Sequence, residues 1–332
     1  MIKLLMKIKK KKVLIFSDYG NEVGLGHISR AKVLENYIEK YSDNIFCYKY
    51  SLNDNLYLKK NLRKSKNLIF QKLDKLINKF KFNIIILNTS KIFEKKFGKK
   101  LIFNLNQKET IKKIISIDGY IKYKNNINKI LIPNVFLEDK FKKDKKILYG
   151  WDKTLINTYK KKKVKLKKKY KILLIISGGT DKYKLASKLP KIINIYLKYN
   201  LKIYWIQGPF AKFDNKLNLV KNLKIIKKKK NLYPYINTAD IVLVQFGVSF
   251  FEALSVGKPA VAYIPKGKEN GLIIKNLNKN RCNVSQKLKD AILLVNKICG
   301  NYSTYYHVAK KIKKKFNFKK NTKLIKKFLD EN

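Results

Sequence analysis

A histidine occupies a glycine-containing loop near the start of the chain. The loop Gly24-Leu25-Gly26-His27 follows an apolar run that ends at Asp18. The amides of such a loop, and the positive end of a helix that follows it, can face an anion. An imidazole titrates close to neutral pH, so His27 is predicted to act as a general base or acid. The predicted substrate contacts in this segment are Gly24, Gly26 and Arg30.

Two other interpretations of this loop are less well supported. A Gly-x-Gly-x-x-Gly dinucleotide fingerprint would need a glycine where Ser29 stands. It would also need an acidic residue at the end of the next predicted strand, and none is found there. A plain tight turn would leave the histidine without a role, although the chain has only two histidines. The second, His307, falls in a predicted closing helix, where we expect an ordinary surface or core position.

A second glycine turn follows a predicted strand in the other half of the chain. Gly178-Gly179-Thr180-Asp181 comes directly after Ile175-Ile176-Ser177. Two glycines and a threonine at a strand end can cradle a diphosphate, and Gly179 and Thr180 are predicted to do so. The same pattern also fits a simple turn.

A third segment combines a strand end, a helix start and a carboxylate. Gly247, Val248 and Ser249 follow the predicted strand 240–244 and open a predicted helix, which makes an anion site. Glu252 is expected on the first turn of that helix, where it could accept two hydrogen bonds from ribose hydroxyls. The alternative is that Glu252 only stabilises the helix dipole.

These motifs require a scaffold of parallel strands. Strands and helices alternate along the first half, and the run Ile84–Leu87 is apolar without alternation, as in a sheet covered on both faces. Strands are predicted at 13–18, 44–50, 67–71, 83–88, 113–118 and 129–133, with a helix at 28–41. In the second half they are predicted at 170–177, 201–207, 223–227, 240–244 and 259–264, with helices at 184–198, 231–238 and 249–256.

The predicted architecture is therefore α/β, with two Rossmann-like domains facing a central cleft. Residues 1–152 form the first domain and residues 153–170, the most lysine-dense stretch, form a linker. Residues 171–302 form the second domain and residues 303–332 a closing helix. Glycine loops after strands are where ligands sit in such sheets.

The net charge of +56 suggests an anionic partner. All but three of the 78 basic residues are lysine, spread along the whole chain, whereas recognition of bases and phosphates favours arginine forks. We therefore predict a solvated lysine surface without a nucleic-acid partner, and at most weak association with an anionic membrane surface.

The apolar runs and the cysteines of the chain favour a cytoplasmic protein, and we expect no metal and no cofactor. No apolar run approaches the ~18–20 residues that span a bilayer, and lysine interrupts the start too soon for a signal peptide. The cysteines Cys47, Cys282 and Cys299 form no Cys-x-x-Cys pair, which argues against a zinc site or a disulfide framework.

Together the three motifs resemble a known family. The loop at 24–30, the turn at 178–181 and the segment from Asp240 to Pro259 resemble the hydrolases that release UDP from UDP-2,4-diacetamido-2,4,6-trideoxy-β-L-altropyranose in pseudaminic acid biosynthesis. The similarity covers about residues 12–285, in order. Its second-half segment is shared with family 28 glycosyltransferases, so that segment indicates nucleotide-sugar binding more than it indicates the reaction.

The resemblance implies a glycosyltransferase-B (GT-B) fold that hydrolyses its substrate with inversion. His27 would activate the attacking water, and Asp18 and Asp118 would orient the base or the sugar. UDP would be held without metal by main-chain amides and by Glu252. The amides implied are those of Gly179, Thr180, Gly247, Val248 and Ser249.

Two departures from the family pattern concern the sugar side. Asn88-Thr89-Ser90 stands where the family usually has an acidic residue followed by His and Tyr, and Gly119 follows Asp118 where a second acidic residue is frequent. A relative that acts on another acylated deoxy-amino sugar is one alternative. The others are a glycosyltransferase with the same nucleotide site and a basic nucleic-acid-binding protein.

Overall fold

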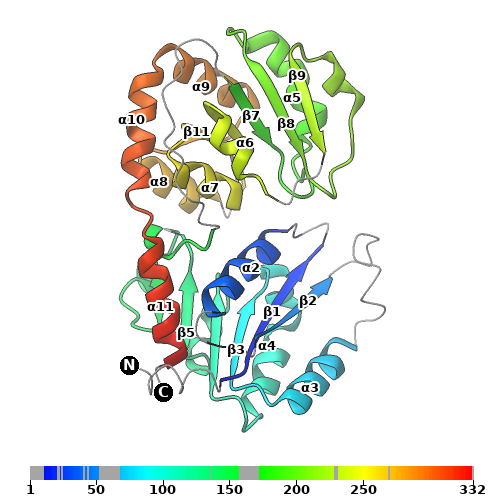
Figure 1. Ribbon diagram of the computed structural model, residues 1–332, viewed down its shortest axis with the longest axis vertical. Coiled ribbons are helices and arrows are strands. Elements are labelled where there is room, and N and C mark those ends of the chain that lie inside the picture. Colours follow the sequence, from blue (N-terminus) through cyan, green and yellow to red (C-terminus); the bar gives the residue numbers. More distant parts are fainter. Residues whose placement is uncertain are drawn as a thin grey trace. The chain divides into compact units, whose positions relative to one another are not determined.

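The chain forms two compact units. The computed structural model describes residues 11–20, 23, 25–39, 42, 45–51, 68–134, 136–156, 172–227, 231–267 and 270–330. The first unit comprises Met1–Leu155 and Asn317–Asn332, and the second comprises Ile156–Phe316. Most of the predicted lysine-rich linker, from residue 157 on, lies outside the described residues. In the described part, each unit is built on its own parallel sheet of six strands (Figure 1).

The sheet of the first unit has the strand order β2-β1-β3-β4-β5-β6. Its strands are β1 (Val13–Tyr19), β2 (Ile45–Ser51), β3 (Ile84–Asn88), β4 (Lys113–Ile117), β5 (Lys129–Ile132) and β6 (Ile147–Tyr149). The helices are α2 (Gly26–Ile38), α3 (Leu68–Phe80), α4 (Lys91–Asn106) and α11 (Phe318–Asp330). The order reverses between β1 and β3, and ligands bind at such a switch point in open α/β sheets.

Both faces of this sheet are covered by helices. Val13 and Ile15 of β1 pack in one core with α2 and α11, while Leu14 and Phe16 pack in another with α3 and α4. Successive strand side chains point to opposite faces, so a strand covered on both sides must be apolar throughout. This explains why residues 13–16 of β1 and 84–87 of β3 are continuous apolar runs.

The chain ends in two helices where we predicted one. Helix α10 (Tyr302–Lys313) belongs to the second unit and α11 to the first. Helix α10 is followed by tightened i→i−3 hydrogen bonds at Lys315 and Phe316, and the side chain of Phe316 is buried.

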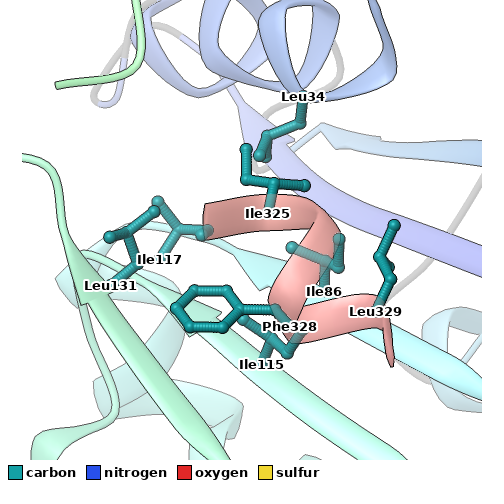
Figure 2. Close-up of a pocket in the computed structure, with 8 residues that line it drawn as sticks. All are labelled: Leu34, Ile86, Ile115, Ile117, Leu131, Ile325, Phe328 and Leu329. Atoms are coloured by element: carbon teal, nitrogen blue, oxygen red, sulfur yellow. The ribbon is translucent and has the colours of Figure 1, made fainter. Parts of the chain in front are cut away.

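Helix α11 completes the core of the first unit. Figure 2 shows its side chains directed at α2 and at the strands. At its C-terminal end, the buried Lys113 donates from Nζ to the carbonyl oxygen of Phe328 at 2.7 Å. A lysine there satisfies an otherwise free carbonyl and complements the negative end of the helix. The apolar contact set is Leu34, Ile86, Ile115, Ile117, Leu131, Ile325, Phe328 and Leu329.

The predicted strand at 67–71 was wrong, because residues from Leu68 begin helix α3. The short apolar run looked like a strand in isolation. The apolar residues Leu73 and Ile77, four apart and both buried, continue it with helical spacing.

The second unit repeats the architecture with the strand order β12-β11-β10-β7-β8-β9. Helices α5 (Leu185–Tyr196) and α9 (Leu288–Gly300) pack in one core with the strands, while α7 (Val248–Val256) contacts β10 and β11. The strands are β7 (Ile172–Ile176), β8 (Lys202–Gln207), β9 (Leu223–Lys227), β10 (Ile241–Gln245), β11 (Ala260–Tyr263) and β12 (Asn283–Ser285). The unit also contains α6 (Tyr233–Thr238) and α8 (Asn270–Lys279).

Candidate active site

His27 and Asp18 form a close pair in the first unit. Asp18 is in β1 and His27 is the second residue of α2, and the imidazole Nδ1 lies 2.6 Å from Oδ1 of Asp18. Asp18 is fully buried, whereas 15% of the His27 side chain is exposed. An ionised carboxylate can only accept, so Nδ1 carries the hydrogen and Nε2 of the neutral ring keeps a lone pair. The structure thus brings together two of the predicted residues.

Asp18 has a second partner that the sequence interpretation missed. The backbone N–H of Ser90 donates to both carboxylate oxygens of Asp18 at 3.0 Å, and the Ser90 hydroxyl donates to Oδ2 at 2.5 Å. Ser90 is the N-cap of α4 and accepts from the N–H of Phe93 at 3.1 Å. A serine between a buried strand and a helix is a typical N-cap signal, which could have located it.

Asn88 links the strand ends to the histidine. It is the last residue of β3 and is fully buried, and its Nδ2 donates to the carbonyl oxygen of His27 at 2.7 Å and to Ser17 Oγ at 2.9 Å. Its Oδ1 has no partner among the described residues. The amide therefore fixes the backbone from which the imidazole projects.

Arg30 and Asp118 pair with one another. The buried Arg30 donates from Nη1 to Oδ2 of Asp118 at 2.7 Å, and Asn134 donates to Oδ1 at 3.3 Å. Asp118 follows β4 with a left-handed φ of 64°. Its side chain is 37% exposed, so it can meet a ligand while it holds Arg30. Gly26 is the first residue of α2, and Gly24 lies outside the described residues.

The glycine turn of the second unit lies at the end of β7. Gly178 has φ 80°, and the N–H of Phe210 donates to the carbonyl oxygen of Gly179 at 2.9 Å. Asp181 accepts from the N–H groups of Leu185 and Ala186, so it caps α5.

Gly208, which follows β8, packs against this turn and was missed by the sequence interpretation. A Cβ at this position would lie 2.0 Å from the carbonyl oxygen of Gly178 and 2.5 Å from that of Gly179. The chain after β8 therefore approaches the turn at 178–180 more closely than any side chain allows, and only glycine fits.

The third motif lies at a neighbouring strand end. Strands β7 and β10 pair in parallel, so the turn after β7 and the segment after β10 share the carboxyl edge of the sheet. Gly247 is the N-cap of α7 and supplies no side chain, which leaves the first amides of the helix at Val248 and Ser249 without a side-chain cap. Such a helix start favours an anion.

We predicted Glu252 on the first turn of α7, and this was wrong. The helix begins at Val248, so Glu252 is its fifth residue, too far along to serve as a first-turn carboxylate. The residue is 8% exposed, and burial raises the pKa of its carboxyl to about 7. Among the described residues, no hydrogen bond reaches this carboxylate. A buried carboxylate without donors lacks compensation for its lost hydration.

Neither a metal site nor a membrane span is found in the described part of the chain. No group of three or more His, Cys, Asp or Glu residues there could hold a metal ion. Of the helices in those same ranges, none is long and apolar enough to cross a bilayer.

Comparisons with known proteins bear on the fold. The chain is similar to an uncharacterised protein of Methanocaldococcus jannaschii, with 27% identity over 276 residues, 75% of this chain and 55% of that protein. It thus spans about half the length of this curated relative. No protein-family model matches it.

Solved structures align along nearly the whole chain. Spinosyn forosaminyltransferase SpnP aligns with a TM-score of 0.63 at 8% identity, covering 97% of this chain and 100% of its own. The UDP-GlcNAc 2-epimerase of Neisseria meningitidis bound to UDP-GlcNAc aligns with a TM-score of 0.58 at 14% identity, covering 97% and 100%. The chain has the GT-B fold. At these identities the likeness concerns the fold alone.

Proposed function

We propose that the chain is an inverting hydrolase of a UDP-linked deoxy-diacetamido sugar, in the synthesis of pseudaminic acid or a related surface-glycan precursor. The observation that carries this proposal is the 2.6 Å contact between His27 Nδ1 and Asp18 Oδ1. It leaves Nε2 of a partly exposed imidazole free to accept a proton, which is what activation of water at neutral pH requires.

The proposed reaction is a single displacement at the anomeric carbon. The water oxygen bonds to that carbon while His27 Nε2 takes one water proton. The bond from the carbon to the diphosphate oxygen breaks, and UDP leaves with the electron pair. The free sugar has the opposite anomeric configuration. Asp18 stabilises the imidazolium that forms, because a fixed carboxylate faces its Nδ1–H.

The second unit is proposed to hold the nucleotide. The uncapped amides of Val248 and Ser249, with Gly247, and the turn at Gly179 and Thr180 suit a diphosphate, and Glu252 suits the ribose hydroxyls. The UDP-GlcNAc complex of the structurally similar epimerase supports a nucleotide-sugar ligand for this fold. In the first unit Gly24, Gly26, Arg30 and Asp118 are assigned to the sugar.

Product release without an acceptor tests the proposal. The purified protein is incubated with UDP-, GDP- and CMP-linked N-acetylated sugars in H₂¹⁸O, and nucleotide and sugar are analysed separately. We expect UDP release with the label in the sugar, and NMR should show the inverted anomer first. Label in the nucleotide phosphate would mean attack at phosphorus and would contradict the mechanism.

A glycosyltransferase is the second candidate, supported by the fold shared with a forosaminyltransferase. Turnover that appears only when a sugar or lipid acceptor is added would favour it over hydrolysis. Salt-sensitive affinity for DNA or RNA that exceeds the affinity for UDP would instead favour a nucleic-acid-binding protein.

A further inference from the structure

The carboxylate of Asp18 is held on two sides by different elements. His27 contacts Oδ1 from α2, while Ser90, between β3 and α4, donates its N–H to both oxygens and its hydroxyl to Oδ2. Strands β1 and β3 pair in parallel with Ser17 opposite Asn88. This register brings residue 90 beside residue 18 at the carboxyl edge of the sheet.

Ser90 is not placed as a nucleophile. Its hydroxyl donates to Asp18 and accepts from the N–H of Phe93, and no contact joins it to the His27 ring in the described structure. A serine nucleophile needs its hydroxyl on the base. Here the order is serine to aspartate to histidine, so the hydroxyl can act only through the carboxylate.

The hydroxyl has a consequence for the orientation of Asp18. A carboxylate held by one donor can rotate about its Cβ–Cγ bond and present either oxygen, or neither, to the ring. Because Ser90 holds Oδ2 and also reaches Oδ1, the rotation is fixed and Oδ1 faces His27 Nδ1. That contact in turn selects the Nδ1–H tautomer of the ring.

We propose that Ser90 is a positioning residue that holds Asp18 so that His27 keeps its hydrogen on Nδ1 and its lone pair on Nε2. Its catalytic consequence rests on the proposed hydrolase function, while its effect on the ring does not. The sequence interpretation assigned no role to this residue.

Three substitutions separate positioning from helix capping. Ser90→Ala removes both the cap and the hydroxyl. Ser90→Gly also removes the hydroxyl, but glycine is a tolerated N-cap, and both variants keep the backbone N–H that reaches Asp18. Ser90→Thr keeps hydroxyl and cap. We expect kcat to fall about 10–100-fold in the Ala and Gly variants with KM and UDP affinity unchanged, and to be restored in the Thr variant.

A second readout does not depend on activity. The chain has only two histidines, so long-range ¹H–¹⁵N NMR of the imidazole rings gives a spectrum that a His307→Gln variant assigns. We expect the Nδ1–H tautomer for His27 in the wild type and the Thr variant, and a tautomer mixture in the Ala and Gly variants. If no UDP-sugar is turned over, this result still supports the positioning role while the proposed function fails.

Two results would contradict the positioning role of Ser90. A Ser90→Gly protein with wild-type kcat and an unchanged His27 tautomer would show that the hydroxyl serves only the cap of α4, and the proposal would be overturned. A wild-type His27 that carries its hydrogen on Nε2 would overturn it as well.

Discussion

His27 Nδ1 lies 2.6 Å from Oδ1 of Asp18, a carboxylate that is itself fully buried and held by Ser90. The two ring nitrogens therefore have different environments, one bound to aspartate and the other available to a ligand. A His27→Ala or His27→Gln substitution should lower turnover roughly 10²–10⁴-fold, because water is a poor nucleophile without its base. UDP affinity, measured by calorimetry, should change little because its proposed contacts are in the second unit. If the His27→Ala protein releases UDP at the wild-type rate, His27 is not the general base.

Replacement of Asp18 tests the orientation of the ring separately. In Asp18→Asn the amide has one oxygen, which the Ser90 donors would claim, so its NH₂ would face His27 Nδ1. That donor forces the hydrogen of the ring onto Nε2, and the base is lost. We expect kcat to fall roughly 10²–10⁴-fold while the protein stays folded by circular dichroism. A variant that retains most of its activity would show that the contact is only structural.

Gly208→Ala should disrupt the proposed diphosphate turn. Its Cβ would meet backbone atoms of Gly178 and Gly179 at 2.0–2.6 Å, which no side-chain rotation relieves. We expect weaker UDP binding and a lower melting temperature. Gly271→Ala is the matched control, because nothing lies within 4 Å of a Cβ there. If both variants bind UDP like the wild type, the turn at 178–180 does not contact the nucleotide.

Asn88→Asp tests why this chain has an amide at the end of β3. The Nδ2 of Asn88 donates to the carbonyl oxygen of His27, and a carboxylate would face that oxygen without a hydrogen. We expect a loss of about 1–3 kcal/mol in the free energy of unfolding at neutral pH, measured in urea. The loss should shrink toward acidic pH, where the new carboxyl can carry a proton and donate. A stability difference independent of pH would contradict this account.

The sequence predicted the scaffold well because continuous apolar runs and glycine turns are local signals. Strands β1, β3 and β7 and their loops needed no tertiary information. The strand prediction at 67–71 failed because its three apolar residues fit a strand or a helix equally, and only later residues of α3 decide between them. The start of α7 was misjudged by one residue, which moved Glu252 off the first turn.

The site was predicted in part, for a related reason. Asp18 lies near the end of β1 and His27 follows the same strand, so local motifs could suggest both. Ser90 and Gly208 are distant in sequence from the residues they contact and meet them only through strand register, β1 with β3 and β7 with β8. The pairing of Arg30 with Asp118 likewise depends on the order of strands in the sheet.

Glu252 should give opposite pH trends for stability and for nucleotide binding. Burial raises its pKa from an ordinary 4.5 to about 7 in the folded chain. Between these values the folded state holds a proton that the unfolded chain has released, so stability falls as pH rises through this window and the loss is complete above about 7. The shift corresponds to about 3 kcal/mol, which Glu252→Gln should recover at pH 8 in urea unfolding.

UDP binding should show the opposite pH trend, because the carboxylate accepts stronger hydrogen bonds from the ribose hydroxyls than the carboxylic acid, in which one oxygen carries a proton. UDP affinity of the wild type should rise from pH 6 to pH 8, and Glu252→Gln should flatten that dependence. Glu252→Ala should weaken UDP binding by about 1.5–3 kcal/mol at pH 8, since a charged acceptor is lost, and should slow the chemical step less. Calorimetry at pH 6 and pH 8 measures the UDP affinity of the wild type and of both variants. If the affinity of the variants equals that of the wild type while the stability trend persists, Glu252 is a buried carboxyl of α7 and has no contact with the nucleotide.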